Sequence, residues 1–135
     1  MPPEEFIGLD IGERRIGVAR GSSAAKIAEP LVVLSTGSEI DALQKLINQH
    51  NPGGIVVGLP RNLRGEETAQ TAKVRAWVNQ AKKSLKPTFY WQDEALTSHE
   101  ATTNRGAQKN DVDAAAAAII LQDFLDSTES NRTVC

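Results

Sequence analysis

The order of the apolar runs along the chain constrains the fold more than any other feature. Two runs with strand-like composition, residues 6–10 and 15–19, flank a short turn at Gly12 and Glu13, and a third run covers residues 31–34. Turns this short join strands that run in opposite directions. The sequence therefore predicts that the chain begins with three antiparallel strands.

The remainder of the chain alternates between helical and strand-like segments. Helical spacing and capping signals predict four helices, and short apolar runs predict two further strands. The helices cover residues 39–50, 69–85, 97–106 and 110–126, and the strands cover residues 55–57 and 88–91. Strand–helix–strand crossovers join parallel strands. We therefore predict an α/β fold with a mixed five-stranded sheet, three antiparallel strands followed by parallel strands, flanked by helices.

The composition is that of one ordinary folded domain. The 135 residues are 40% hydrophobic and 24% charged, and a chain of this length forms a single core. We expect one domain over residues 1–126 and a disordered polar tail over residues 127–135. Fifteen Lys and Arg residues against 17 Asp and Glu residues give a net charge of −2. This balance excludes a protein that holds nucleic acid by bulk positive charge, so a nucleic-acid partner must be held locally.

Cysteine use and the length of the apolar runs limit the cellular context. Cys135 is the only cysteine, so the chain can form no internal disulfide and no zinc site built from cysteines. The longest apolar run, residues 114–121, is far shorter than the roughly 20 residues that a membrane-spanning helix needs. We expect a cytoplasmic protein with no membrane partner.

Three acidic residues stand at positions where they can meet. Asp10 ends the first strand, Glu94 follows the fifth strand, and Asp113 lies on the inward side of the last helix. The carboxyl ends of parallel strands meet at one edge of a sheet, where open α/β sheets bind ligands. Three carboxylates gathered there need a cation, and a ligand set made only of oxygen selects Mg²⁺ or Mn²⁺. Two such ions support phosphodiester hydrolysis.

Each of these acids also has an ordinary structural explanation. Asp10 can begin a turn, and Glu94, next to Asp93, can be a solvated loop residue. Asp113 can serve the dipole of its helix. The hypothesis of a metal site therefore depends on the topology that brings the three acids together.

A set of motifs follows a fixed order along nearly the whole chain. The motifs are Gly8-Leu9-Asp10-Ile11-Gly12 with Arg15-Ile16-Gly17-Val18-Ala19, Ala28-Glu29-Pro30-Leu31, Val56-Val57-Gly58-Leu59-Pro60 with Asn62 and Gly65, Val74-Arg75, Asp93-Glu94-Ala95-Leu96-Thr97, and Val112-Asp113-Ala114 with Ile119-Ile120-Leu121-Gln122. In this order they resemble the YqgF/RuvX family of pre-16S rRNA nucleases. The resemblance implies a ribonuclease H-like fold related to Holliday junction resolvases. It also implies that Asp10, Glu94 and Asp113 are the catalytic acids that bind two Mg²⁺ or Mn²⁺ ions.

The chain departs from the family pattern at three places. Ala95 stands where the family usually has Arg after the Asp-Glu pair. Arg20-Gly21-Ser22 replaces a segment that usually contains Asp, and Leu63-Arg64 stands where the family often has Met-Asp. These differences concern substrate contacts more than metal binding, and two of them make the surroundings of the site more basic.

Basic and polar side chains lie in the loops and elements where a phosphate backbone could run. The candidate substrate-binding residues are Arg14, Arg15, Arg61, Asn62, Arg64, Arg75 and Lys109. Arg15 can equally be a strand residue that pairs with a surface acid, and Lys109 can be an exposed charge before a helix. These alternatives remain open on the sequence alone.

The leading hypothesis is a metal-dependent endonuclease for structured RNA, which the resemblance assigns to the 5′ end of pre-16S rRNA in ribosome biogenesis. A Holliday junction resolvase acting on branched DNA is the first alternative, and its twofold substrate calls for a dimer. A non-catalytic RNA-binding assembly factor is a further alternative. An actin-like ATP-binding domain would need a second domain that this length does not supply. We expect the protein to be a monomer or a homodimer.

Overall fold

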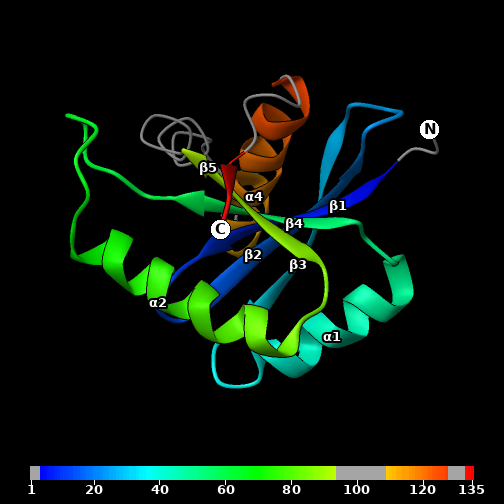
Figure 1. Cartoon of the computed structure of the whole chain (residues 1–135), viewed down its shortest axis with the longest axis horizontal. Helices are drawn as coiled ribbons and strands as arrows, with labels where there is room; N and C mark the ends of the chain where they lie inside the picture. The colour runs from blue at the N-terminus through cyan, green and yellow to red at the C-terminus, as the bar shows by residue number, and fades with distance from the viewer. Residues whose placement is uncertain (1–3, 94–108, 128–132) are drawn as a thin grey trace.

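The computed structural model describes residues 4–93, 109–127 and 133–135 (Figure 1). The helix expected over residues 97–106 lies outside these residues. The strands are β1 (Glu5–Ile11), β2 (Arg15–Ser22), β3 (Ala28–Ser35), β4 (Gly54–Leu59), β5 (Thr88–Asp93) and β6 (Thr133–Val134). The helices are α1 (Glu39–His50), α2 (Ala69–Ser84) and α4 (Lys109–Asp126).

The strands form one mixed sheet in the order β3-β2-β1-β4-β5-β6. β1 pairs antiparallel with β2, and β2 pairs antiparallel with β3. β4 pairs parallel with both β1 and β5. The predicted α/β fold, with antiparallel strands followed by parallel ones, is therefore confirmed.

The prediction of five strands is wrong by one. Thr133 and Val134 form β6, which pairs antiparallel with Trp91 and Tyr90 of β5. No strand is predicted in this part of the polar tail. Two residues are too few to show the alternation by which a strand is recognised in a sequence, so only the pairing itself reveals β6.

Helices cover both faces of the sheet. In Figure 1, α1 and α2 lie on one side of the strands and α4 on the other. Alternate strand residues divide between two cores, as period-two side chains require: Leu9 and Val57 pack with Val78 of α2, whereas Phe6 and Val56 pack with α4. The apolar side chains expected on the inward face of α4 are all buried, namely Ala114, Ala117, Ile120, Leu121 and Phe124.

Local signals mark the end of α1 and the start of α2. α1 has the predicted bounds, and it ends at Asn51, whose left-handed backbone (φ 49°) lets its N–H donate to the carbonyl oxygen of Ile47. α2 begins with a capping box between Thr68 and Thr71. No helix in the described ranges is long and apolar enough to span a bilayer.

Two glycines let α4 lie directly against the strands. A Cβ atom on Gly17 of β2 would overlap the carbonyl oxygen of Asp113, and one on Gly8 of β1 would lie 2.7 Å from the Cβ of Leu121. Glycine within a strand often marks such a close backbone approach. Because Asp10 is the cross-strand partner of Gly17, the contact at Gly17 brings the start of α4 next to Asp10.

Replacing Gly17 should therefore displace α4. We expect Gly17→Ala to lower the free energy of unfolding by about 1–3 kcal/mol, the usual cost of overpacking. The control is Gly53→Ala, whose new Cβ would meet only the flexible carboxylate of Glu4. Urea denaturation followed by circular dichroism measures both variants, and equal transition midpoints for Gly17→Ala and wild type would show that α4 does not depend on this contact.

Candidate active site

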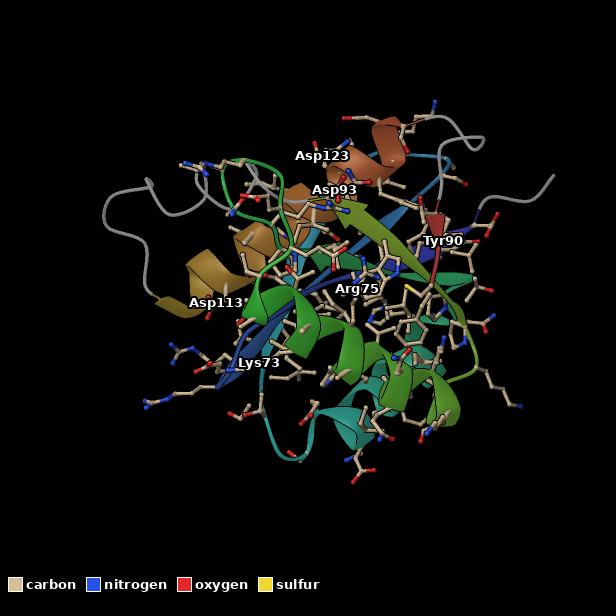
Figure 2. All side chains as sticks on the ribbon, turned by 60° about the vertical axis from the view of Figure 1, so that its left-hand side comes forward. Lys73, Arg75, Tyr90, Asp93, Asp113 and Asp123 are labelled. Atoms are coloured by element: carbon tan, nitrogen blue, oxygen red, sulfur yellow. The ribbon has the colours of Figure 1, made fainter. Side chains whose placement is uncertain are left out.

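Asp10 and Asp113 come together at the edge of the sheet where β1 ends. Asp10 is the penultimate residue of β1, and Asp113 lies in the first turns of α4 (Figure 2). Both side chains are half-buried. Their carboxylates are close enough that the charge of Asp113 acts on the titration of Asp10. Two of the three predicted acids, 103 positions apart in sequence, thus share one site.

The environment of Asp10 opposes its negative charge. Burial, and secondly the charge of Asp113, raise the pKa of Asp10 from its ordinary value of 3.8 to about 6. No described residue donates a hydrogen bond to its carboxylate. A carboxylate without a donor, within electrostatic reach of a second carboxylate, fits a hard divalent cation, because a cation would stabilise the charge of Asp10.

Arg15 holds Asp113 in place. Its Nε donates to Oδ2 of Asp113 at 3.0 Å, and about 31% and 27% of the two side chains are exposed. The sequence left open whether Arg15 contacts the substrate or pairs with an acid. In the structure Arg15 pairs with an acid, and this acid, Asp113, is itself a candidate metal ligand. The pair fixes the orientation of Asp113 and compensates its charge.

The remaining predicted ligand lies outside the described residues. Glu94 follows Asp93, the last residue of β5, in sequence. Within the described ranges, no group of three His, Cys, Asp or Glu side chains is placed to hold a metal ion. Asp10 and Asp113 are therefore the described part of the predicted ligand set. Lys109 is the first residue of α4.

Asn62 shapes the loop between β4 and α2. Its Oδ1 accepts hydrogen bonds from the backbone N–H groups of Arg64 (3.0 Å) and Glu66 (2.9 Å). The backbone of Gly65, in a left-handed conformation with φ 78°, closes the turn onto the carbonyl oxygen of Asn62. The side chain of Asn62 is thus engaged in the loop, whereas the side chain of Arg64 is exposed and has no partner among the residues described.

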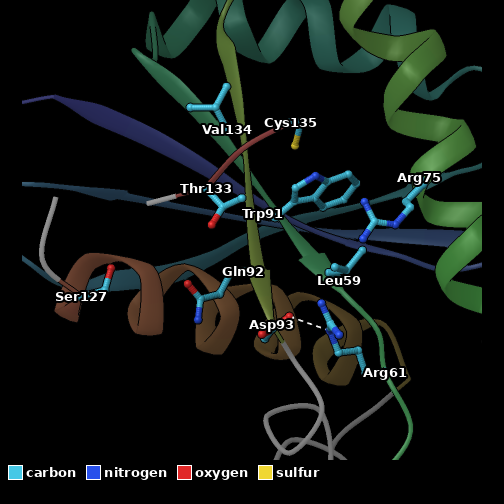
Figure 3. Close-up of a pocket in the computed structure, with 10 residues that line it drawn as sticks. All are labelled: Leu59, Arg61, Arg75, Trp91, Gln92, Asp93, Ser127, Thr133, Val134 and Cys135. Carbon is cyan, nitrogen blue, oxygen red and sulfur yellow. Dashed lines mark hydrogen bonds and ion pairs between the residues drawn. The ribbon is translucent and has the colours of Figure 1, made fainter. Parts of the chain in front are cut away.

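Four of the predicted basic residues line two cavities. Arg14, which is exposed, and Arg15 line a shallow cavity of about 260 Å³ beside Asp113. Arg61 and Arg75 line a larger cavity of about 590 Å³ at the outer edge of β5, which we call the β5 cavity (Figure 3). The candidate phosphate contacts therefore lie on two sides of the sheet edge that carries Asp10.

Both arginines of the β5 cavity are paired with acids. Arg61 binds Asp93 at 2.9 Å and the carbonyl oxygen of Gly65 at 3.1 Å. Arg75 binds both carboxylate oxygens of Glu67 at 2.9 Å and lies over the ring of Trp91, 5.4 Å from its centroid. These pairs depend on the path that the chain takes between β4 and α2, which residue spacing does not determine.

Two residues at this edge of the sheet are not among the predicted site residues. Gly17 makes the close approach of α4 possible, and a glycine inside an apolar strand was an available signal for it. Gln92 lines the β5 cavity on the same sheet edge. Nothing in its local sequence distinguishes Gln92 from an ordinary strand residue.

Comparison with solved structures supports the fold. RuvC of Thermus thermophilus in complex with a Holliday junction substrate matches with a TM-score of 0.63 at 14% identity, covering 98% of this chain and 99% of that chain. A second structure of Thermus thermophilus RuvC matches with a TM-score of 0.60 at 15% identity. At these identities the likeness concerns the fold alone, and it confirms the predicted ribonuclease H-like fold.

Sequence comparison supplies the family. A protein of Thermoanaerobacter pseudethanolicus named "Putative pre-16S rRNA nuclease" is 34% identical, over 93% of this chain and 98% of that protein. A protein of the same name from Pseudomonas syringae pv. tomato is 37% identical over 90% of each chain. The model of the RuvX family, described as Holliday junction resolvase, matches residues 4–127. The resemblance found in the sequence is therefore confirmed, and the chain belongs to the RuvX family.

Proposed function

We propose that this chain is a divalent-metal-dependent nuclease that cleaves structured RNA and processes the 5′ end of pre-16S rRNA. One observation carries the proposal: the carboxylates of Asp10 and Asp113 approach each other at the ligand-binding edge of the sheet, and Asp10 has no hydrogen-bond donor among the described residues. The names of the curated relatives support pre-16S rRNA as the substrate.

Asp10, Asp113 and Glu94 would hold Mg²⁺ or Mn²⁺ in this proposal. Bound ions of this kind activate a water molecule and stabilise the leaving oxygen of a phosphodiester. The donor set fits them, because carboxylate oxygens are the ligands that hard cations prefer. Arg15 keeps the Asp113 carboxylate oriented through the 3.0 Å contact, so part of the ligand geometry exists before any ion arrives.

The basic residues would guide the substrate backbone to these acids. Because the net charge of the chain is −2, binding depends on local contacts rather than on the overall field. Arg14 and Arg64 are exposed and form no hydrogen-bonded ion pair in the described part of the chain. We assign them to phosphate contacts, and we assign Asn62 to the shape of the loop that carries Arg64.

A resolvase acting on branched DNA is the second candidate. It is favoured by the description of the family model and by the likeness to the fold of RuvC. Paired cleavage of a four-way junction needs two sites related by twofold symmetry. A dimer in solution that cuts junctions faster than structured RNA would select this candidate.

Asp10→Asn tests the role of the central acid. We expect cleavage of structured RNA in Mg²⁺ or Mn²⁺ to fall at least about a thousandfold, which corresponds to roughly 4 kcal/mol of lost transition-state stabilisation. The matched control is Asp41→Asn, the same change at an exposed acid of α1, and it should cleave at the wild-type rate. Cleavage by Asp10→Asn within about tenfold of wild type would remove Asp10 from the catalytic machinery.

The same variant predicts a pH-dependent gain in stability when metal is removed. The pKa of Asp10 is about 6 in the folded protein and 3.8 ordinarily, so the fold disfavours its charge. Between pH 3.8 and pH 6 the free energy of unfolding of the wild type falls as pH rises. Above pH 6 the full cost of burying the charged Asp10 carboxylate is present. Asp10→Asn escapes this cost.

Denaturation in EDTA at pH 4 and pH 7 measures the effect. The free energy of unfolding of Asp10→Asn relative to wild type should increase between these pH values by about 2 kcal/mol, because a small part of the cost is already present at pH 4. Asp41→Asn again provides the control. If the difference in free energy of unfolding between Asp10→Asn and wild type stays constant with pH, the pKa of Asp10 is not raised.

A further inference from the structure

The β5 cavity has the size and place of a nucleotide subsite. Its volume of about 590 Å³ lies within the range of small-molecule pockets. It opens at the outer edge of β5, where side chains from both faces of the strand reach it (Figure 3). Trp91 and Arg75 contribute from one face, and Gln92 contributes from the other.

The register of the sheet places Gln92 level with Asp10. Leu9, Val57 and Trp91 form one row across β1, β4 and β5, so Asp10 and Gln92 each lie one residue beyond that row. Both belong to the face that α4 covers, because Leu9 and Trp91 point to the opposite core. Two strand spacings put their backbones on the order of 10 Å apart. Gly58, the partner of Gln92 on β4, carries no side chain between them.

The walls of the cavity favour a nucleobase over a free phosphate. The guanidinium groups of Arg61 and Arg75 are compensated by Asp93 and Glu67, so an isolated anion gains little from them. The same ion pairs restrain both guanidinium groups, and the guanidinium carbon of Arg75 lies over the Trp91 ring. Guanidinium planes and aromatic rings are the surfaces on which unpaired bases stack.

Gln92 supplies the hydrogen bonds that a base edge requires. Its half-buried amide has one donor and one acceptor group, and neither has a partner among the described residues. The indole N–H of Trp91 is likewise without a partner there. A base that is already paired has its Watson–Crick edge occupied, so this amide would read an unpaired base.

From these contacts we infer that the β5 cavity binds an unpaired nucleobase of the substrate strand beside the bond that is cleaved, with Gln92 contacting the edge of the base. This inference rests on the proposed nuclease function, since it takes the substrate strand to pass the Asp10 site. The preferred substrate is then an RNA with a single-stranded nucleotide next to a helix, rather than a continuous duplex.

Binding of a fluorescent RNA series tests the inference without cleavage. Each RNA is a hairpin with a single-stranded flank, and a 2-aminopurine is placed in turn at each position across the junction between helix and flank. Matched RNAs carry an abasic nucleotide at that position, or a strand that pairs with it. Dissociation constants are measured in EDTA for the wild type, Gln92→Leu and Gln80→Leu, which makes the same change at an exposed position of α2.

At one position, the wild type should bind the unpaired base at least about tenfold more tightly than the abasic and paired RNAs, with quenched 2-aminopurine fluorescence. Gln92→Leu should lose most of this preference, while its affinity for the abasic RNA stays unchanged, and Gln80→Leu should behave as wild type. Trp91 is left intact because it packs against the core. The inference is overturned if the wild type shows no base-dependent binding at any position, or if Gln92→Leu keeps the full preference.

Cleavage of the same RNAs in Mn²⁺ separates this inference from the proposed function. Base-dependent binding that is lost in Gln92→Leu, with no cleavage of any RNA, would leave the subsite standing and reject the nuclease. Cleavage that proceeds equally on abasic and unpaired RNAs, with equal binding, would support the nuclease and reject the subsite.

Discussion

The contact between α4 and the backbone of β2 at Gly17 determines the geometry of the candidate site. Asp10 is fixed by β1, whose position depends on pairing with β2 and β4. Asp113 reaches it only because the helix approaches the strand more closely than any residue with a Cβ would allow. Alanines at the inward positions of α4 continue this close packing along the sheet. The site is therefore a consequence of packing between small residues.

This packing creates an electrostatic cost that the fold alone does not relieve. Two carboxylates lie near each other in a half-buried place, and burial, together with the charge of Asp113, raises the pKa of Asp10. Arg15 compensates Asp113, but no described group does the same for Asp10. Proteins retain such uncompensated groups at functional sites, where a ligand supplies the missing interaction. A divalent cation is the ligand whose charge and donor preference match both acids.

Local patterns were enough to predict most of the fold. The bounds of α1, the burial of both faces of β4 and the inward face of α4 all follow from hydrophobic spacing within single segments. The two-residue strand β6 carries no such pattern, and its position became visible only through pairing with β5. Parallel pairing of β1, β4 and β5 was inferable because crossovers restrict the topology.

The site was less predictable because it is built from contacts distant in sequence. The topology suggested that Asp10 and Asp113 could meet, yet the role of Gly17 and the pairing of Arg15 with Asp113 depend on how a helix is seated on two strands. Arg61 and Arg75 were predicted as substrate contacts from their position in the chain, whereas their partners Asp93 and Glu67 depend on the path of the loop that Asn62 shapes. The spacing of residues along the sequence does not determine which way these arginine side chains point.

Calorimetric titration of the protein with Mn²⁺ at several pH values tests the central claim most directly. If Asp10 and Asp113 form a cation site, binding should release up to one proton per site below pH 6, and the affinity should fall by about tenfold per pH unit there, because the ion displaces the proton of Asp10. Asp113→Asn should weaken binding strongly at every pH. Mn²⁺ binding that is independent of pH and unchanged in Asp113→Asn would contradict the account.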